Sequence, residues 1–90
     1  MIRKRYHIIG RVQGVGFRYF THGHANRIGV TGWVKNQGDG SVLCEAQGTP
    51  EQLADLETQI NKGPAWGHVR ELKVVDIPIK ETESSFDVTY

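Results

Sequence analysis

A glycine-rich run near the start of the chain has the residue types of an anion-binding loop. Residues 10–18 read Gly-Arg-Val-Gln-Gly-Val-Gly-Phe-Arg, which places glycines just ahead of a segment with helical spacing and Arg18 within its first turn. A helix N-terminus carries free backbone N–H groups and about half a positive charge, and glycine lets an anion approach the backbone closely. The planar guanidinium of Arg18 matches two phosphate oxygens. The run indicates a site for a phosphate-sized anion, although the same residues also suit a tight connection without a ligand.

Two common nucleotide-binding motifs do not fit this run. A Walker-type loop requires Lys-Ser or Lys-Thr where the helix opens, and these pairs are absent from the run. A dinucleotide-binding turn requires a small residue at the position of Tyr19, after Gly14 and Gly16. Both nucleotide motifs are therefore excluded.

Hydrophobic periodicity predicts a strand before this loop and a helix after it. Residues 6–12 alternate in polarity as a half-buried strand does, and residues 17–28 carry apolar side chains at roughly helical spacing. Gly29 suits the C-cap of that helix. The loop is therefore expected to connect a strand to a helix N-terminus.

The middle of the chain predicts a β-hairpin followed by a second helix. Residues 32–36 and 41–46 have the pattern of paired strands, and the Asp-Gly pair between them favours a tight turn. Thr49 and Pro50 begin the second helix, which is expected to end near residue 61, and a Gln three positions after Thr49 can close a capping box. The remaining β-rich segments are residues 69–79 and 86–90.

This order of elements predicts a ferredoxin-like α+β fold, the split βαβ arrangement, with two helices on one face of an antiparallel sheet. Ninety residues leave room for one core, so residues 1–90 are expected to form a single domain. The first strand, the first helix and the second strand then run up, down and up, which brings Arg18 and Asn36 to one edge of the sheet. The loop of residues 63–68 reaches the same edge, where Trp66 is expected to wall the site.

Charge and cysteine content argue against several classes of partner. Eleven Lys and Arg against ten Asp and Glu give a net charge of +1, which provides no bulk attraction to nucleic acid or to an anionic membrane. No apolar stretch approaches the roughly 18 residues of a membrane span. The single Cys44 has no partner for an internal disulfide, and the first residues do not have the pattern of a signal peptide. We expect a cytoplasmic location.

Two motifs resemble the signatures of the acylphosphatase family. Residues 10–18 resemble its phosphate loop, and residues 32–36 followed by residues 39–42 resemble its second signature. The similarity extends over essentially the whole chain, up to the aromatic Tyr90. It implies an enzyme that hydrolyses the carboxyl-phosphate bond of small acyl phosphates, in which Asn36 orients the attacking water. The residues that it implies for phosphate binding are Gln13, Gly14, Val15, Gly16, Phe17 and Arg18, the first five through their backbone amides.

Hydrolysis of an acyl phosphate requires few catalytic groups. Its leaving group is a carboxylate, a weak base that needs no general acid, and phosphoryl transfer is carried mostly by positioning and electrostatic stabilisation. Neither Arg18 nor Asn36 is a base at neutral pH, so we expect the proton of the water to pass to a phosphate oxygen of the substrate. No Cys, His, Asp or Glu cluster has metal-ligand spacing, so neither a metal nor a cofactor is expected. Inorganic phosphate is expected to bind as product or inhibitor, and a monomer suffices.

Two other functions stay open on the residues alone. A ferredoxin-like RNA-binding module would carry aromatic side chains on its central strands and a basic face, whereas residues 41–46 contain no aromatic residue and the net charge is near zero. A regulatory domain that keeps the phosphate loop without turnover is the second alternative. Cys44 is expected to be a buried apolar residue rather than a nucleophile, and the histidines are expected to be solvated rather than ligands.

Overall fold

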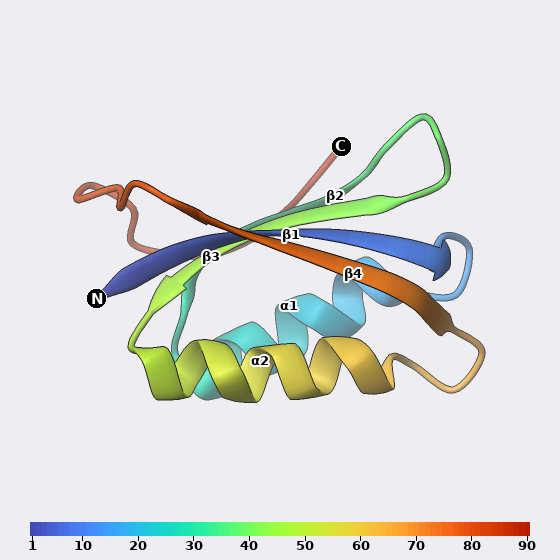
Figure 1. Ribbon diagram of the computed structural model, residues 1–90, viewed down its shortest axis with the longest axis horizontal. Helices are drawn as coiled ribbons and strands as arrows, with labels where there is room; N and C mark the ends of the chain where they lie inside the picture. Colours follow the sequence, from blue (N-terminus) through green and yellow to red (C-terminus); the bar gives the residue numbers. More distant parts are fainter.

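The chain folds into two layers, a five-stranded sheet with two helices packed against one of its faces (Figure 1). The structure is a computed structural model that describes all of residues 1–90. The order of the strands in the sheet is β4-β1-β3-β2-β5. The predicted ferredoxin-like α+β fold is confirmed. The elements in chain order are β1 (Ile2–Arg11), α1 (Phe17–Ile28), β2 (Thr31–Asn36), β3 (Val42–Gly48), α2 (Pro50–Lys62), β4 (His68–Ile77) and β5 (Phe86–Thr89).

The sheet is mixed rather than wholly antiparallel. Strands β1, β2, β3 and β4 pair antiparallel as predicted, but β5 pairs parallel with β2, with Gly32 opposite Phe86 and Lys35 opposite Thr89. The segment after β4 crosses back before β5 begins, so β5 can run in the same direction as β2. This pairing places the end of the chain beside the end of β2.

Strand β1 is longer than its sequence pattern predicts. It begins at Ile2 rather than at Tyr6, because Arg3 already lies in register between Gln47 of β3 and Ile77 of β4. The first residues of β1 are rich in Lys and Arg, which hides the strand pattern. Arg3 is nevertheless buried, since Glu45 and Glu83 accept hydrogen bonds from its guanidinium.

Both helices begin and end at the residues that the sequence predicts, to within one position. Helix α1 is followed by Gly29 in the left-handed conformation, at φ 98°, and the N–H of Gly29 donates to the carbonyl of Ala25. Helix α2 begins with the predicted capping box, in which the Thr49 hydroxyl and the Gln52 side chain satisfy each other's backbone N–H groups. These caps fix the two ends of the helical layer.

One apolar core fills the space between the helices and the sheet. The α2 side chains Leu53, Leu56 and Ile60 are fully buried, and Phe17 at the start of α1 is 1% exposed. Burial of Phe17 anchors the residue that joins the glycine-rich loop to the helix. The remaining buried apolar side chains are Tyr6, Ile8, Val12, Ala25, Val30, Val34, Val42, Cys44, Ala46 and Phe86.

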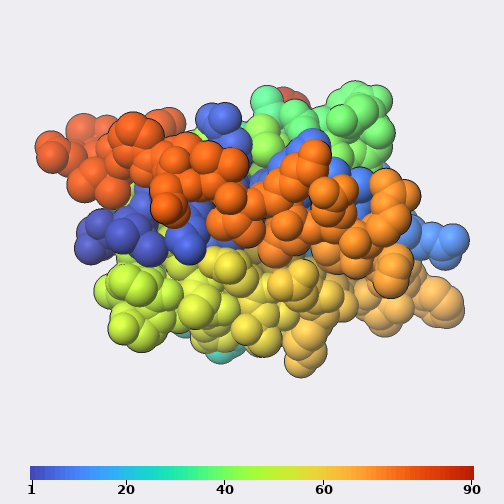
Figure 2. Space-filling model, in the orientation of Figure 1, coloured from blue at the N-terminus to red at the C-terminus, as the bar shows by residue number.

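Strand β4 forms an edge of the sheet and pairs only with β1. Its side chains, orange in Figure 2, spread across the surface of the molecule in that view. None of the helices is long and apolar enough to cross a membrane.

Candidate active site

The glycine-rich loop contains two glycines with positive φ, a feature that it shares with anion-binding nests. Gly14 and Gly16 have φ angles of 74° and 78°, whereas Val15 between them does not have positive φ. Residues that alternate in this way turn successive N–H groups toward one point and form a concavity for an anion. Gly16 also caps α1 without any side-chain hydrogen bond, and the first turn of α1 contains no acidic residue. The free N–H groups of the helix therefore face this loop with no internal anion to satisfy them.

A cavity of about 130 Å³ lies between this loop and the end of β2. Arg18 and Asn36 both line it, as the topology predicts. The cavity is large enough for a phosphoryl group and a water molecule. The other residues that line it are Val12, Gly14, Gly16, Phe17 and Tyr19.

Arg18 is held in place by the end of the chain rather than by a carboxylate. One of its guanidinium nitrogens donates to the Thr89 carbonyl at 3.3 Å, and its Cζ atom lies 4.7 Å from the centroid of the Tyr90 ring. The Tyr90 hydroxyl lies 2.8 Å from that of Tyr19, whose ring centroid is 5.9 Å from the same Cζ. A guanidinium at the positive end of a helix is unfavourable unless an anion neutralises both charges. Arg18 is thus a fixed cation that lacks an anionic partner.

Asn36 is the last residue of β2 and lies opposite Val42 of β3. Its side chain is half-buried at the wall of the cavity, where its amide is available both to donate and to accept a hydrogen bond. A water molecule bound there would lie within the same cavity as an anion on the loop.

Gln13 has a role that the sequence did not indicate. Its side-chain amide donates to the carbonyls of Gln37 at 2.7 Å and Ser41 at 2.8 Å, which ties the glycine-rich loop to the turn after Asn36. Of the residues predicted to bind phosphate, four line the cavity: Gly14, Gly16, Phe17 and Arg18. Gln13 and Val15 do not line it. Gln13 lies 24 and 28 positions from its two partners in the sequence, so no local sequence pattern predicts these hydrogen bonds.

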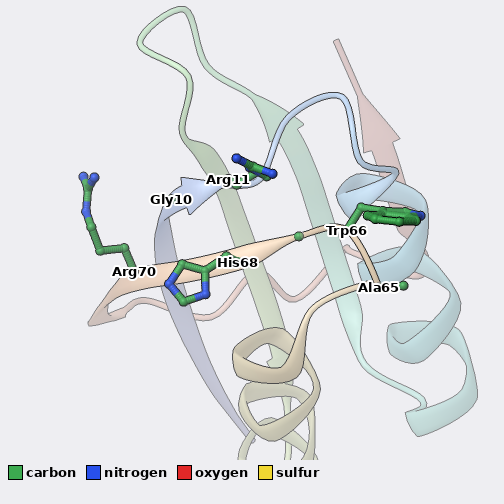
Figure 3. Close-up of a pocket in the computed structure, with 7 residues that line it drawn as sticks. Gly10, Arg11, Ala65, Trp66, His68 and Arg70 are labelled. Carbon is green, nitrogen blue, oxygen red and sulfur yellow. The ribbon is translucent and has the colours of Figure 1, made fainter.

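Trp66 does not wall this cavity. The loop that carries it does reach the same edge of the sheet, since a Cβ atom at Gly63 would lie 3.4 Å from the Phe17 ring. The Trp66 side chain is 80% exposed, however, and lines a separate hollow beside β1 and β4 (Figure 3). Tyr19 and Tyr90 are the aromatic residues that border Arg18 instead.

The cysteine and the histidines lie away from the cavity. Burial raises the pKa of the Cys44 thiol, which keeps it protonated and unreactive. His22 and His24 contact Asn26 and Arg27 on their own helix, and His7 bonds to the Ser41 hydroxyl. No group of three or more His, Cys, Asp or Glu side chains is placed to hold a metal ion.

Fold and cavity together define a small α+β protein in which Arg18 and Asn36 line one cavity at the N-terminus of α1. The acylphosphatase family profile matches residues 4–88. An acylphosphatase of Bifidobacterium longum is 48% identical over 98% of this chain and 92% of its own, and one of Nitratidesulfovibrio vulgaris is 45% identical over 100% and 92%. The crystal structure of the acylphosphatase from Bacillus subtilis superposes with a TM-score of 0.96 at 34% identity, with both chains fully covered. The chain belongs to the acylphosphatase family, and its activity is the hydrolysis of acyl phosphates.

Proposed function

We propose that Arg18 and the backbone amides of residues 13–17 bind the phosphoryl group of an acyl phosphate, while Asn36 orients the water that attacks it. The observation that carries this proposal is the shared cavity at the N-terminus of α1, which both Arg18 and Asn36 line. The volume of about 130 Å³ suits a phosphoryl group and one water, and the loop, the helix N-terminus and the guanidinium all favour negative charge.

In the proposed step the water oxygen attacks phosphorus as the bond between phosphorus and the carboxylate oxygen breaks. The carboxylate leaves with the bonding electron pair, and the water proton passes to a phosphate oxygen. Arg18 neutralises the charge on the phosphoryl oxygens, and Asn36 holds the water in line with the leaving group. No carboxylate or histidine lines the cavity to act as a base, in agreement with transfer of the proton to the substrate.

We further propose that residues 1–90 act as one domain and as a monomer in the cytoplasm, without metal or cofactor, and that inorganic phosphate binds as product. The continuous core supports a single domain. The free Cys44 supports a reducing compartment, because the chain has no disulfide. The near-neutral net charge supports a small-molecule substrate rather than nucleic acid or a membrane surface.

Phosphate release from benzoyl phosphate, measured with and without EDTA, tests the proposal. We expect turnover that EDTA leaves intact and that inorganic phosphate inhibits competitively. An alkyl phosphate should be hydrolysed at least a hundredfold more slowly, because its alkoxide leaving group needs a general acid that the cavity lacks, and such an acid typically contributes about 10²–10⁴-fold. Loss of activity in EDTA with recovery on adding a divalent cation, or comparable rates with the alkyl phosphate, would contradict the proposed chemistry.

A further inference from the structure

The side chain of Arg18 is held by the last two residues of the chain. It donates to the Thr89 carbonyl, lies against the Tyr90 ring and makes no other hydrogen bond within the protein. Strand β5, which ends at Thr89, has only four residues and pairs only with β2, at an edge of the sheet. A short strand at a chain end frays unless other contacts tie it down. The position of Arg18 therefore depends on how firmly β5 is held.

Residues 78–85, which we call the strap, connect β4 to β5 at the opposite edge of the sheet. The strap contains no helix or strand, and Glu83 is its only residue that is not exposed. Figure 1 shows the strap at the end of the sheet where the N-terminus lies, whereas the glycine-rich loop lies at the other end. Any effect of the strap on the phosphate cavity must therefore pass along β5.

Two buried side chains attach the strap to the sheet. Both carboxylate oxygens of Glu83 accept hydrogen bonds from the Arg3 guanidinium, at 2.6 and 3.1 Å, and the two side chains are only 14% and 0% exposed. The side-chain amide of Gln47 accepts from the backbone N–H of Lys80 at 2.7 Å and donates to its carbonyl at 2.9 Å. No other hydrogen bond ties residues 78–84 to the sheet. A bidentate ion pair shielded from water holds its geometry more firmly than an exposed pair does.

The pairing of β5 with β2 begins directly after the Glu83 attachment. Only Ser84 separates Glu83 from Ser85, whose carbonyl accepts from the Gly32 N–H at 3.0 Å. The parallel register then continues to Thr89, the residue that accepts from Arg18. The attachment at Glu83 thus fixes the start of the strand whose end holds Arg18.

We propose that Glu83 is a positioning residue for Arg18, which acts from the opposite end of the sheet by holding β5 in place through its ion pair with Arg3. The inference rests on the proposed binding of phosphate by Arg18. While β5 is docked on β2, Arg18 keeps its contacts with Thr89 and Tyr90, and when β5 frays it loses both. Phosphate therefore binds the docked state more tightly, and by linkage phosphate binding stabilises the docking of β5 in return.

Glu83→Gln tests this inference, because it removes the charge of the attachment while Glu45 still pairs with Arg3 and keeps the sheet folded. We expect faster hydrogen exchange of the backbone amides of residues 86–90. The KM for benzoyl phosphate and the inhibition constant of inorganic phosphate should rise by the same factor, roughly threefold or more, with kcat unchanged, because a saturating ligand restores the docked state. Saturating phosphate should slow the exchange of residues 86–90 again. Glu83→Asp keeps the charge on a shorter side chain and should shift the same constants in the same direction by less.

Two control variants separate this role from a general loss of stability. Glu81→Gln removes an exposed carboxylate of the strap that makes no hydrogen bond, and it should change none of these quantities. Thr49→Ala removes the capping box of α2, so it should lower the melting temperature but leave KM, phosphate inhibition and the exchange of residues 86–90 as in the wild type. Unchanged phosphate inhibition in a folded Glu83→Gln protein, or an equal rise in Thr49→Ala, would overturn the inference.

A double-mutant cycle with Arg18→Gln tests whether Glu83 acts through Arg18. In the Arg18→Gln protein, the further change Glu83→Gln should leave the phosphate dissociation constant, measured by isothermal titration, unchanged. A further rise by the same factor as in the wild-type background would overturn the inference. Failure of the proposed function gives a different result, since Arg18→Gln alone would then bind phosphate as the wild type does.

Discussion

The guanidinium of Arg18 lies over the ring of Tyr90, with its Cζ atom 4.7 Å from the ring centroid, while it donates to the carbonyl of Thr89. Thr89 belongs to β5, which pairs parallel with β2 and sets Thr89 opposite Lys35. The next residue in β2 is Asn36. One strand pairing thus fixes both proposed catalytic side chains relative to each other, and the end of the chain becomes part of the site.

Replacement of Tyr90 tests this positioning. Tyr90→Ala removes the ring under Arg18 and the hydroxyl that bonds to Tyr19, so the guanidinium gains freedom that phosphate binding must then remove. A cation–π contact at an exposed site contributes about 0.5–1 kcal/mol, so we expect KM and the inhibition constant of phosphate to rise roughly twofold to fivefold. Tyr90→Phe keeps the ring and should change both constants less. Steady-state kinetics with phosphate inhibition measures the effect, and unchanged constants in Tyr90→Ala would show that Thr89 alone holds Arg18.

Two glycine substitutions should change stability in opposite directions. Gly10→Ala places a Cβ atom within 2.1 Å of the His68 carbonyl oxygen at a φ of 144°, so it must disrupt the β1–β4 pairing, and we expect a loss of about 2 kcal/mol or more. Gly23→Ala lies within α1 with open space around it and should raise the free energy of unfolding by about 0.5–1 kcal/mol. Urea denaturation of the two variants measures both changes. A Gly10→Ala protein as stable as the wild type would contradict the close approach of the His68 carbonyl to Gly10.

The buried ion pairs on the outer face of the sheet predict a loss of stability in acid. Burial alone would raise the pKa of Glu45, but hydrogen bonds from Arg5 and Arg3 outweigh it and hold that pKa below its usual range. A carboxylate with a depressed folded-state pKa stabilises the fold above its unfolded-state pKa, and this contribution is lost as the pH falls through the folded-state pKa. The free energy of unfolding should therefore decrease from about pH 4.5 downward, near the ordinary value for Glu.

Glu45→Gln provides the test of this assignment. It leaves the buried guanidinium of Arg3 with only Glu83 as an anionic partner, so we expect a cost on the order of 3 kcal/mol at neutral pH. Because the variant lacks the titrating group, its stability should depend less steeply on pH below 4.5 than that of the wild type. If stability fell equally steeply with pH in the two proteins, Glu45 would be excluded as the cause of the loss of stability in acid.

The sequence predicted the features that depend on local chemistry. The capping box at Thr49, the C-cap at Gly29 and the hairpin were predictable because neighbouring residues determine them. The parallel addition of β5, the link from Gln13 to the Ser41 carbonyl and the contact of Tyr90 with Arg18 depend on residues far apart in the chain, so no periodicity reports them. Trp66 was assigned to the wrong cavity for the same reason: the sequence placed its loop at the correct edge but did not determine which way the side chain faces.

The proposed roles of Arg18 and Asn36 predict different kinetic effects of replacing each residue. Arg18 would contact the phosphoryl group in the ground state and in the transition state, so Arg18→Gln should both raise the inhibition constant of phosphate and lower kcat by a large factor. Arg18→Lys keeps the charge but loses the planar fork, and it should stay strongly impaired. Asn36 would contact the water and not the phosphate, so Asn36→Ala should lower kcat roughly a hundredfold or more while phosphate inhibition stays within about threefold of wild type.

Thermal melts of each variant are the necessary control, because the kinetic comparison applies only to folded proteins. Both side chains are half-buried at the cavity wall and outside the apolar core, so we expect the folded state to persist. Phosphate binding, measured directly by isothermal titration, then separates the two roles independently of turnover. A folded Asn36→Ala protein with near-normal kcat, or a folded Arg18→Gln protein that binds phosphate as tightly as the wild type, would show that the residues of this cavity act in other roles than those proposed.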